Sequence, residues 1–272
     1  MKAKAEAFAV PPVRAVKTLA APQRTSDMRA LLIVVIGLIV AIEVASRFVP
    51  AYIMPSPASI GVALLELLQT DYVHVAVTIL RLAGAIVFAM IAGVLVGLLM
   101  ATSPRVGAYL KSLVLIDTGI PALSWMLIAV FWFKDAELRI FFILAVILLP
   151  FYALNVYEGI KALPNEWLDM IQSFRPTRRQ VMRYLILPHV VSYIFLTTKS
   201  VIGYAIRMVV FAELVASAVG IGSRMSLAQS TFRIDSVLAW TVLLVVLNLV
   251  LQWLAGVAER RLLPWRIEAN VR

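Results

Sequence analysis

Long apolar runs recur along the chain, and each is long enough to cross a lipid bilayer. About 20 consecutive apolar residues are needed for a helix to span the hydrocarbon core. By this criterion the sequence predicts six transmembrane helices, at residues 30–49, 74–101, 107–133, 139–158, 188–214 and 236–258. The pattern therefore predicts an all-α membrane protein.

A shorter amphipathic segment lies between the first two runs. Ser56 can cap a helix that begins with Pro57, because serine accepts a hydrogen bond from the first turn and proline suits the first helical position. The apolar residues that follow share one face of this helix: Ile60, Leu64, Leu67 and Leu68. We therefore expect a helix at the membrane interface that does not cross the bilayer.

The N-terminal segment is rich in alanine, proline, lysine and arginine and shows no helical periodicity. We expect residues 1–28 to form a disordered, basic, cytoplasmic tail, because this composition offers little apolar surface to bury. A cleaved signal peptide is the alternative, but the long basic lead-in and Glu43 argue against it. The transmembrane domain is then expected at residues 29–265, with a C-terminal tail at 266–272.

Lysine and arginine residues are concentrated in four segments outside the runs. These are the N-terminal tail, the loop at 102–112, the loop after the fourth run and the C-terminus, which share one side of a six-helix topology. The positive-inside rule places that side, with both termini, in the cytoplasm. Because topology explains the net charge of +10, no nucleic-acid partner is predicted.

Composition narrows the chemistry that the chain can perform. It is 62% hydrophobic, more than an average soluble domain. The absence of cysteine excludes disulfides, thiolate metal sites and a cysteine nucleophile. Its two histidines, His74 and His189, are far apart in sequence, and no G-x-x-x-x-G-K-[ST] phosphate-binding motif occurs. We therefore expect no catalytic residue, metal site or cofactor.

The loop after the fourth run has the sequence NEWLDMIQSFRPTRRQVMRYLILP, at residues 165–188. Asn165 is a candidate N-cap, and the acidic Glu166 and Asp169 suit the positive end of a helix. An apolar face follows at Trp167, Leu168, Ile171 and Phe174. Such a stripe indicates a docking surface for a cytoplasmic partner. The alternative is a helix that lies on the lipid surface.

The second half of this loop predicts another helix. Pro176 is expected to end the first helix, because proline disfavours the helical conformation of the preceding residue. Thr177-Arg178-Arg179-Gln180 then has the spacing of a capping box. Pro188 is expected to interrupt the second helix near the start of the fifth apolar run, where a kink would follow.

The loop resembles the EAA loop of permease subunits in bacterial ABC importers. The family's acidic-Ala-Ala core corresponds to Asp169-Met170-Ile171, and its Leu-Pro finish to Ile186-Leu187-Pro188. Further stretches over about residues 50–265 are similar to the family in order: IMPSP, TILRLAGAIVFAMIAGVLVGLLMATS, IPALSWMLIAVFWF, LPFYALNVYEGIKALPNEWLDM and VVFAELVASAVGIGSRM. The similarity is to the branch that handles nitrate, sulfonate, taurine and bicarbonate.

The chain departs from the family pattern at three positions. Arg175 stands where the loop usually has glycine, Leu127 where the third span usually has a second proline, and Lys134 where glycine usually follows WF. Glu213 matches the family's Ala-Glu; a boundary charge that meets solvent is the alternative. Gly220-Ile221-Gly222 predicts a flexible break after it.

The resemblance implies the type I ABC importer permease fold, in a multi-pass subunit of the bacterial inner membrane. It implies a coupling loop at 159–188, with ATPase contacts at Glu166, Trp167, Asp169, Ile171, Phe174 and Arg175. The implied partners are a second permease, identical or related, two cytoplasmic ATP-binding subunits and a periplasmic or lipoprotein substrate-binding protein. The implied activity is alternating-access import of a small organic or inorganic anion.

Polar residues around a proline indicate a translocation path. Pro121 breaks the third run, with Asp117, Thr118 and Ser124 close to it in sequence. Broken helices at mid-membrane are typical of transport paths. A packed kink is the alternative.

Basic residues within the runs point to the same path. Arg81, Lys199 and Arg207 fall inside predicted spans, where an unpaired charge costs at least a few kcal/mol. Lys199 and Arg207 lie about 80° apart around a helix, and few carboxylates are available to neutralise them. We expect these two residues to line a path for an anion. The alternative is that Arg81 and Lys199, which match positions that are often basic in permeases of ABC importers, share a structural role and that Arg207 reaches the outer surface.

Two other classes of function remain as alternatives. A stand-alone secondary transporter would need carboxylates at mid-membrane, for which Asp117 and Glu43 are the candidates. A membrane enzyme would need a positioned acid, base, nucleophile or metal, and the sequence offers no such group of residues.

Overall fold

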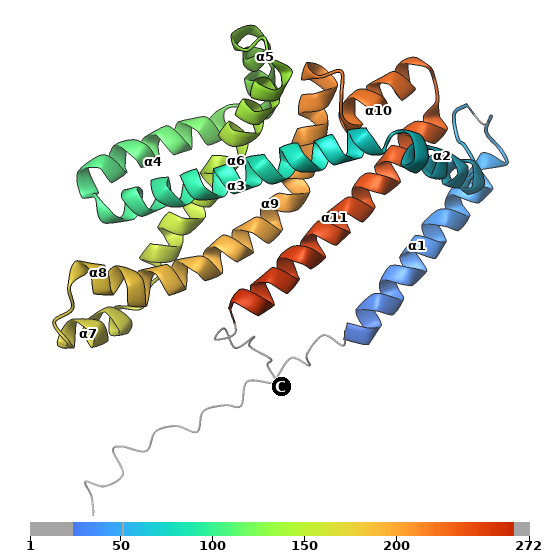
Figure 1. Cartoon of the computed structure of the whole chain (residues 1–272). Helices are drawn as coiled ribbons and strands as arrows, with labels where there is room; N and C mark the ends of the chain where they lie inside the picture. The colour runs from blue at the N-terminus through green and yellow to red at the C-terminus, as the bar shows by residue number, and fades with distance from the viewer. Residues whose placement is uncertain (1–23, 51, 264–272) are drawn as a thin grey trace, which may run out of the picture. The chain divides into compact units, whose positions relative to one another are not determined.

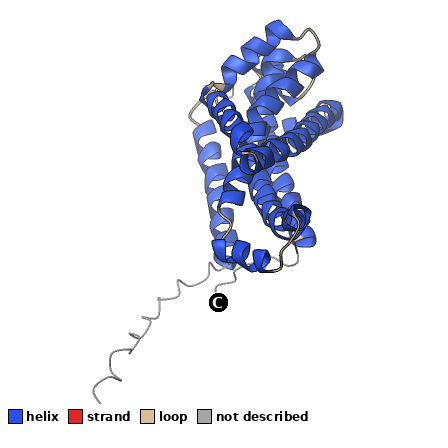
Figure 2. Ribbon diagram, turned by 90° about the vertical axis from the view of Figure 1, so that its left-hand side faces the viewer, coloured by secondary structure: helices blue, strands red, loops and turns tan. Residues whose placement is uncertain are grey.

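The structure is a computed structural model that describes residues 24–50 and 52–263 of the 272-residue chain. Helices and loops account for all of the described backbone (Figure 2). The helices of Figure 1 have these bounds: α1 Arg24–Ser46, α2 Pro57–Thr70, α3 Tyr72–Thr102, α4 Pro104–Gly119, α5 Ala122–Trp132, α6 Ala136–Lys161, α7 Asn165–Ser173, α8 Arg178–Val181, a π-helical turn Met182–Ile186, α9 Leu187–Ala216, α10 Ile221–Ser230 and α11 Ile234–Leu262.

Four helical segments within the described residues are long and apolar enough to cross a membrane. They are α3, α6, α11 and the continuous segment Arg178–Ala216, and the bent pair α4–α5 counts as a fifth. These five correspond to the second to sixth predicted spans. The first predicted span, 30–49, falls on α1, whose apolar part within the described residues, Leu32–Ser46, is shorter than a span. The sixth crossing therefore stays a prediction.

The terminal segments can be compared with prediction only in part. Helix α1 begins at Arg24, inside the predicted tail 1–28, so residues 24–28 are helical. Residues 1–23 and the predicted tail at 266–272 lie outside the described residues. Residues 42–263 form one compact unit. The account below concerns the unit at 42–263.

Helix α2 begins as the sequence predicts. The Ser56 hydroxyl accepts a hydrogen bond of 3.2 Å from the backbone N–H of Ser59, and Pro57 is the first helical residue. Its buried residues, Ala63 and Leu67, pack against Trp240 of α11. Leu68 is 45% exposed and lies outside this contact. At roughly 100° per residue, Leu68 is turned away from the line that Ala63 and Leu67 form.

The core of the unit lies where α3, α6 and α9 pack together, with α5 against them (Figure 1). Two glycines let α3 approach α6 closely. A Cβ at Gly93 would lie 2.8 Å from the carbonyl oxygen of Leu149, and one at Gly97 would lie 2.6 Å from that of Ala153. Small residues commonly allow such close backbone approach between membrane helices.

The second helix of the predicted coupling loop continues uninterrupted into the fifth span, so the interruption expected at Pro188 was wrong. Thr177 and Gln180 form the predicted capping box, in which the Thr177 N–H donates to Gln180 Oε1 over 2.7 Å. A π-helical turn precedes Pro188, and the Leu187 N–H donates to the Met182 carbonyl one residue further back than in an α-helix. Pro188 has no backbone N–H with which to continue the α-helical hydrogen bonds. The wider turn accommodates this missing donor, so the helix continues through Pro188.

Candidate functional site

The third predicted span is divided into two helices. Helix α4 ends at Gly119, α5 begins at Ala122, and the axes of the two helices are bent by 96°. Ile120 and Pro121 between them are extended, with ψ angles of 123° and 137°. Pro121 disfavours helical geometry at Ile120, which explains the position of the break. The bend is a break rather than a kink within a continuous helix, and α5 continues unbroken through Leu127.

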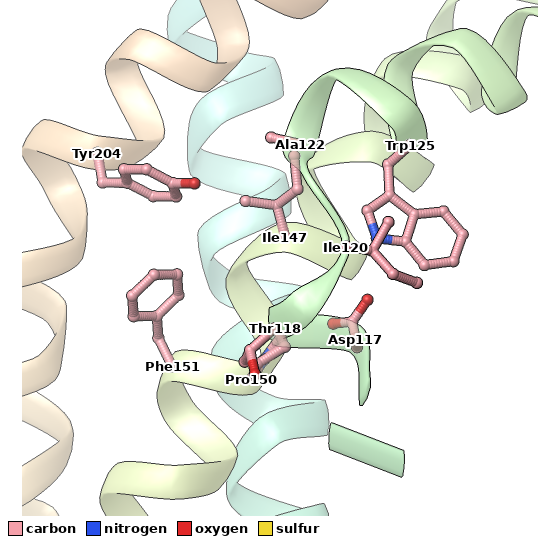
Figure 3. Close-up of a pocket in the computed structure, with 9 residues that line it drawn as sticks. All are labelled: Asp117, Thr118, Ile120, Ala122, Trp125, Ile147, Pro150, Phe151 and Tyr204. Carbon is pink, nitrogen blue, oxygen red and sulfur yellow. The ribbon is translucent and has the colours of Figure 1, made fainter. Parts of the chain in front are cut away.

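A cavity of about 100 Å³ lies beside this break (Figure 3). Two of the four predicted path residues near Pro121 line it, Asp117 and Thr118, whereas Pro121 and Ser124 do not. Figure 3 shows the Asp117 carboxylate and the Trp125 indole nitrogen turned toward each other, with Phe151 and Tyr204 on the opposite side. Among the described residues, Asp117 Oδ1 and Trp125 Nε1 are buried without a hydrogen-bond partner.

The basic residues of the spans have different surroundings. Lys199 of α9 forms an ion pair with Glu259 of α11, so the expectation that it lacks a nearby carboxylate was wrong. Arg207 is exposed and has no ion pair or side-chain hydrogen bond with any residue that the structure describes. Arg81 forms ion pairs with both Glu137 and Glu213, which agrees with a structural role for it.

Glu213 is fully buried near the end of α9. Its carboxylate accepts hydrogen bonds from Arg81 Nη1 at 2.9 Å, from the Thr78 hydroxyl at 2.8 Å and from the Gly222 N–H at 3.0 Å. The interpretation as a boundary charge that meets solvent was therefore wrong. The sequence did not indicate these contacts. Thr78 lies far from Glu213 along the chain, and Gly222 follows Glu213 only after a turn.

The same cluster holds the segment between α9 and α10 in place. Arg81 Nη1 donates to the Val219 carbonyl at 2.7 Å, and the Gly220 N–H donates to His74 Nδ1 at 3.0 Å. Gly220 has φ = 121°, and a Cβ there would collide with the Glu213 carboxylate. The predicted flexible break at Gly220-Ile221-Gly222 is thus a hydrogen-bonded turn that requires glycine. We refer to His74, Thr78, Arg81, Glu137 and Glu213, with the residues of this turn, as the Glu213 network.

The first helix of the predicted coupling loop, α7, has no buried residue. Pro164 occupies its N-cap position and Asn165 is the first helical residue, so the assignment of Asn165 as the cap was wrong. Trp167 is 46% exposed and meets the ring of His189 edge-on at 6.1 Å. Phe174 follows the last helical residue and is 80% exposed.

The other predicted coupling residues lie on or just after this helix. Glu166 and Asp169 are exposed and Ile171 is half-buried. The helix ends at Ser173, before the position at which Pro176 was expected to end it. Arg175 takes a left-handed conformation, with φ = 48°, and its N–H donates to the Gln172 carbonyl at 2.9 Å. Glycine adopts this conformation without steric cost, which explains why glycine is usual here and why Arg175 can replace it only with strain.

The described residues contain no group of three or more histidine, aspartate or glutamate side chains that could hold a metal ion.

The sequence has relatives among transport proteins. Residues 89–264 match the family described as "Binding-protein-dependent transport system inner membrane component". The chain is 28% identical to the taurine transport system permease protein TauC of Escherichia coli (strain K12), over 74% of this chain and 73% of that one. It is 25% identical to a putative aliphatic sulfonates transport permease protein, SsuC of Bacillus subtilis (strain 168), over 80% of both chains. It is 24% identical to the nitrate import permease protein NrtB of Leptolyngbya laminosa, over 70% of this chain and 68% of that one.

Solved structures share the fold. A chain of the MetNI methionine ABC transporter in an inward-facing conformation aligns with a TM-score of 0.63 at 15% identity, over 72% of this chain and 97% of that one. A chain of an amino acid ABC transporter solved with histidines aligns with a TM-score of 0.55 at 20% identity, over the same shares of the two chains. These alignments confirm the predicted type I importer permease fold.

We expect Glu213→Gln to destabilise the protein by about 3 kcal/mol, because Arg81 then loses a buried charged partner. Thermal unfolding of the purified protein in detergent measures the change. Glu43→Gln is the matched control, since Glu43 pairs with Arg47 on an exposed helix surface, where an ion pair contributes about 1 kcal/mol or less. Equal unfolding temperatures for wild type and Glu213→Gln would contradict the structural role of the Glu213 network.

Proposed function

The chain belongs to the family of binding-protein-dependent transport system inner membrane components, and we propose that it forms the path by which a small anion enters the cell in an ATP-driven importer. It is a multi-pass inner-membrane permease subunit and not an enzyme. The family assignment removes the two alternatives, a stand-alone secondary transporter and a membrane enzyme.

Two observations support an anionic substrate. The relatives named above are described as permeases for taurine, aliphatic sulfonates and nitrate, each of which contains a negatively charged sulfonate or nitrate group. Arg207 is an exposed basic residue on α9, and no described residue neutralises it. A charge in a span is tolerated where it faces water or a solute of opposite charge. Lys199 is already paired with Glu259, so we give Arg207 the larger part in attracting the anion and Lys199 a smaller part.

We propose that the path runs beside the cavity at the break between α4 and α5. We place Asp117, Thr118, Pro121 and Ser124 along it, together with Arg207 and Lys199 on α9. Tyr204, which lines the cavity, lies on the same helix as these two basic residues, so one helix connects the cavity with the cations.

The single observation that carries the coupling mechanism is that α7 leaves its side chains unburied and yet leads into a long rigid helix. The segment Arg178–Ala216 is continuous over 39 residues, and its far end carries Glu213. A displacement of α7 by an ATPase would therefore be transmitted along α9 to the Glu213 network. Rigid-body movement of such an element can alternate access between the two sides of the membrane.

The assembly that we propose follows from this arrangement. Two ATP-binding subunits dock on the α7 segments of two permeases, which are identical or related, and a periplasmic or lipoprotein binding protein delivers the solute on the other side. The ATPase contacts are made by Trp167, Ile171 and Phe174, with Glu166, Asp169 and Arg175 at the edge of the surface.

Replacing Trp167 and Phe174 together by alanine should weaken the ATPase complex at least about tenfold, because large aromatic side chains dominate binding energy at interfaces. Copurification of the ATPase with the tagged permease measures the loss. Phe232→Ala is the matched control: Phe232 is also 80% exposed, but it lies in the connection between α10 and α11, away from α7 (Figure 1). Retention of the ATPase, with uptake still dependent on ATP, would show that α7 only lies on lipid.

Reporter fusions test the orientation. Glu137 and Met170 lie near opposite ends of α6, a helix of 26 residues. The positive-inside rule predicts that a reporter at residue 137 is periplasmic and one at residue 170 cytoplasmic. The reverse pattern would place α7 outside the cell and exclude the proposed ATPase contact.

Arg207→Met should lower the uptake of the transported anion about tenfold, because it removes the unneutralised cation on α9. Arg207→Lys is the matched control and should retain most of the uptake, since it keeps the charge. Uptake into proteoliposomes that contain the complete importer measures both. Wild-type uptake by an assembled Arg207→Met complex would overturn the role of this residue.

A further inference from the structure

A cluster of rings joins the exposed helix α7 to the transmembrane helices. His189, near the start of α9, meets Trp167 of α7 edge-on, with 6.1 Å between the ring centroids. We propose that His189 is a positioning residue of the coupling loop, which holds α7 through Trp167 so that a displacement of α7 by the ATPase also moves α9. The inference rests on the proposed function, because it names the side chain through which the docking surface acts on the path.

The end of α6 fixes the His189 ring in place. His189 Nε2 donates a hydrogen bond of 3.0 Å to the Gly159 carbonyl, since a carbonyl oxygen can only accept. The last carbonyls of a helix lack partners within the helix. The Leu163 N–H would bond the Gly159 carbonyl if α6 continued, but it donates to the Ile160 carbonyl instead. The imidazole of His189 therefore supplies the donor that the end of α6 lacks.

A second ring holds the imidazole from the side of α9. Tyr193 lies one turn further along α9, and its ring centroid is 5.2 Å from that of His189. The Tyr193 ring in turn lies against Gly159, where a Cβ would be 2.8 Å from the ring. The missing side chain at Gly159 thus lets α6 and α9 approach closely beside His189. The imidazole is held by α6 and α9 together, and it meets α7 at Trp167.

The covalent connection from α7 to the next helix is a short turn. Arg175 takes a left-handed conformation there, and Pro176 follows it. Helix α7 has no buried residue, so packing holds little of it. Rotation about the turn would absorb part of any push on α7 unless a second contact braces the helix. The contact between Trp167 and His189 provides this brace, and it acts directly on the continuous segment Arg178–Ala216.

Trp167 has enough free surface to serve two contacts at once. It is 46% exposed, so part of its side chain is open to an ATPase while its ring faces His189. An edge-on pair of aromatic rings is a favoured geometry. A partner that presses on the exposed part of Trp167 would therefore act on His189, and through it on α9.

Hydrogen–deuterium exchange of the full-length permease in nanodiscs, before the ATPase is added, tests the contact. His189→Ala should speed exchange of the α7 amides about tenfold and leave α3 unchanged, because losing a ring pair makes local opening easier. His189→Gln keeps a donor for the Gly159 carbonyl but removes the ring, so it should behave like His189→Ala. His189→Phe keeps a ring between Trp167 and Tyr193 and should retain most of the protection. Tyr184→Ala is the matched control, because Tyr184 is an exposed ring on the π-helical turn, outside this cluster.

Transport by the complete importer in proteoliposomes tests the consequence. His189→Ala should still bind the ATPase and hydrolyse ATP, but it should import about tenfold less solute per ATP, whereas His189→Phe should keep most of the import. The probe is whichever of taurine, ethanesulfonate and nitrate the wild type imports. A merely structural role would lower assembly and hydrolysis together with import, so the ratio of import to hydrolysis reports on positioning.

Unchanged exchange of the α7 amides in His189→Ala would overturn the inference, and so would a wild-type ratio of import to hydrolysis in that variant. Equal behaviour of His189→Gln and His189→Phe would overturn it too, and this comparison decides even if His189→Ala does not fold. A wild-type complex that hydrolyses ATP but imports none of the three solutes would instead count against the proposed function. The exchange measurement needs no solute, so it would still decide whether His189 holds α7.

Discussion

The arrangement of the unit at 42–263 depends on one buried carboxylate. Glu213 is fully buried, and an ionised carboxylate can persist in such a place only if charged and polar groups surround it. The groups that do so come from α3 and from the start of α10. Buried ion pairs add little net stability, but leaving one partner alone is costly. The Glu213 network therefore restricts where these elements can lie more than it strengthens the fold.

Because of this restriction, the two ends of α9 differ in how firmly they are held. The end that carries Glu213 is tied through Arg81 to α3 and, through Glu137, to the start of α6. The other end continues through the π-helical turn into α8 and the exposed α7, where the capping box of Thr177 is a local contact. A helix that is held at one end and accessible at the other can transmit a displacement. The basic residues of the proposed path lie between these ends, so the same helix would couple docking to the path.

The sequence predicted those features that depend on neighbouring residues. The second, fourth, fifth and sixth spans, the cap at Ser56 and the capping box at Thr177 follow from local composition and spacing, and the structure confirms them. The family was recognisable because its motifs occur in order along the chain. Contacts between distant residues were not predictable: Thr78 with Glu213, and Lys199 with Glu259, join separate helices. The demand for such partners was visible in the buried charges, but their identity depended on how the helices pack.

Arg175, which stands where the family pattern has glycine, shows how local backbone strain is tolerated in the loop that carries α7. Arg175 holds a left-handed conformation that costs roughly 1–2 kcal/mol for a residue with a Cβ. The turn forms nevertheless, because the Arg175 N–H reaches the Gln172 carbonyl and the Thr177 capping box starts the next helix two residues later. The backbone turn of the loop therefore forms although an exposed arginine side chain stands where glycine has only a hydrogen atom. On the proposed docking surface the substitution adds a positive charge while the backbone turn still forms.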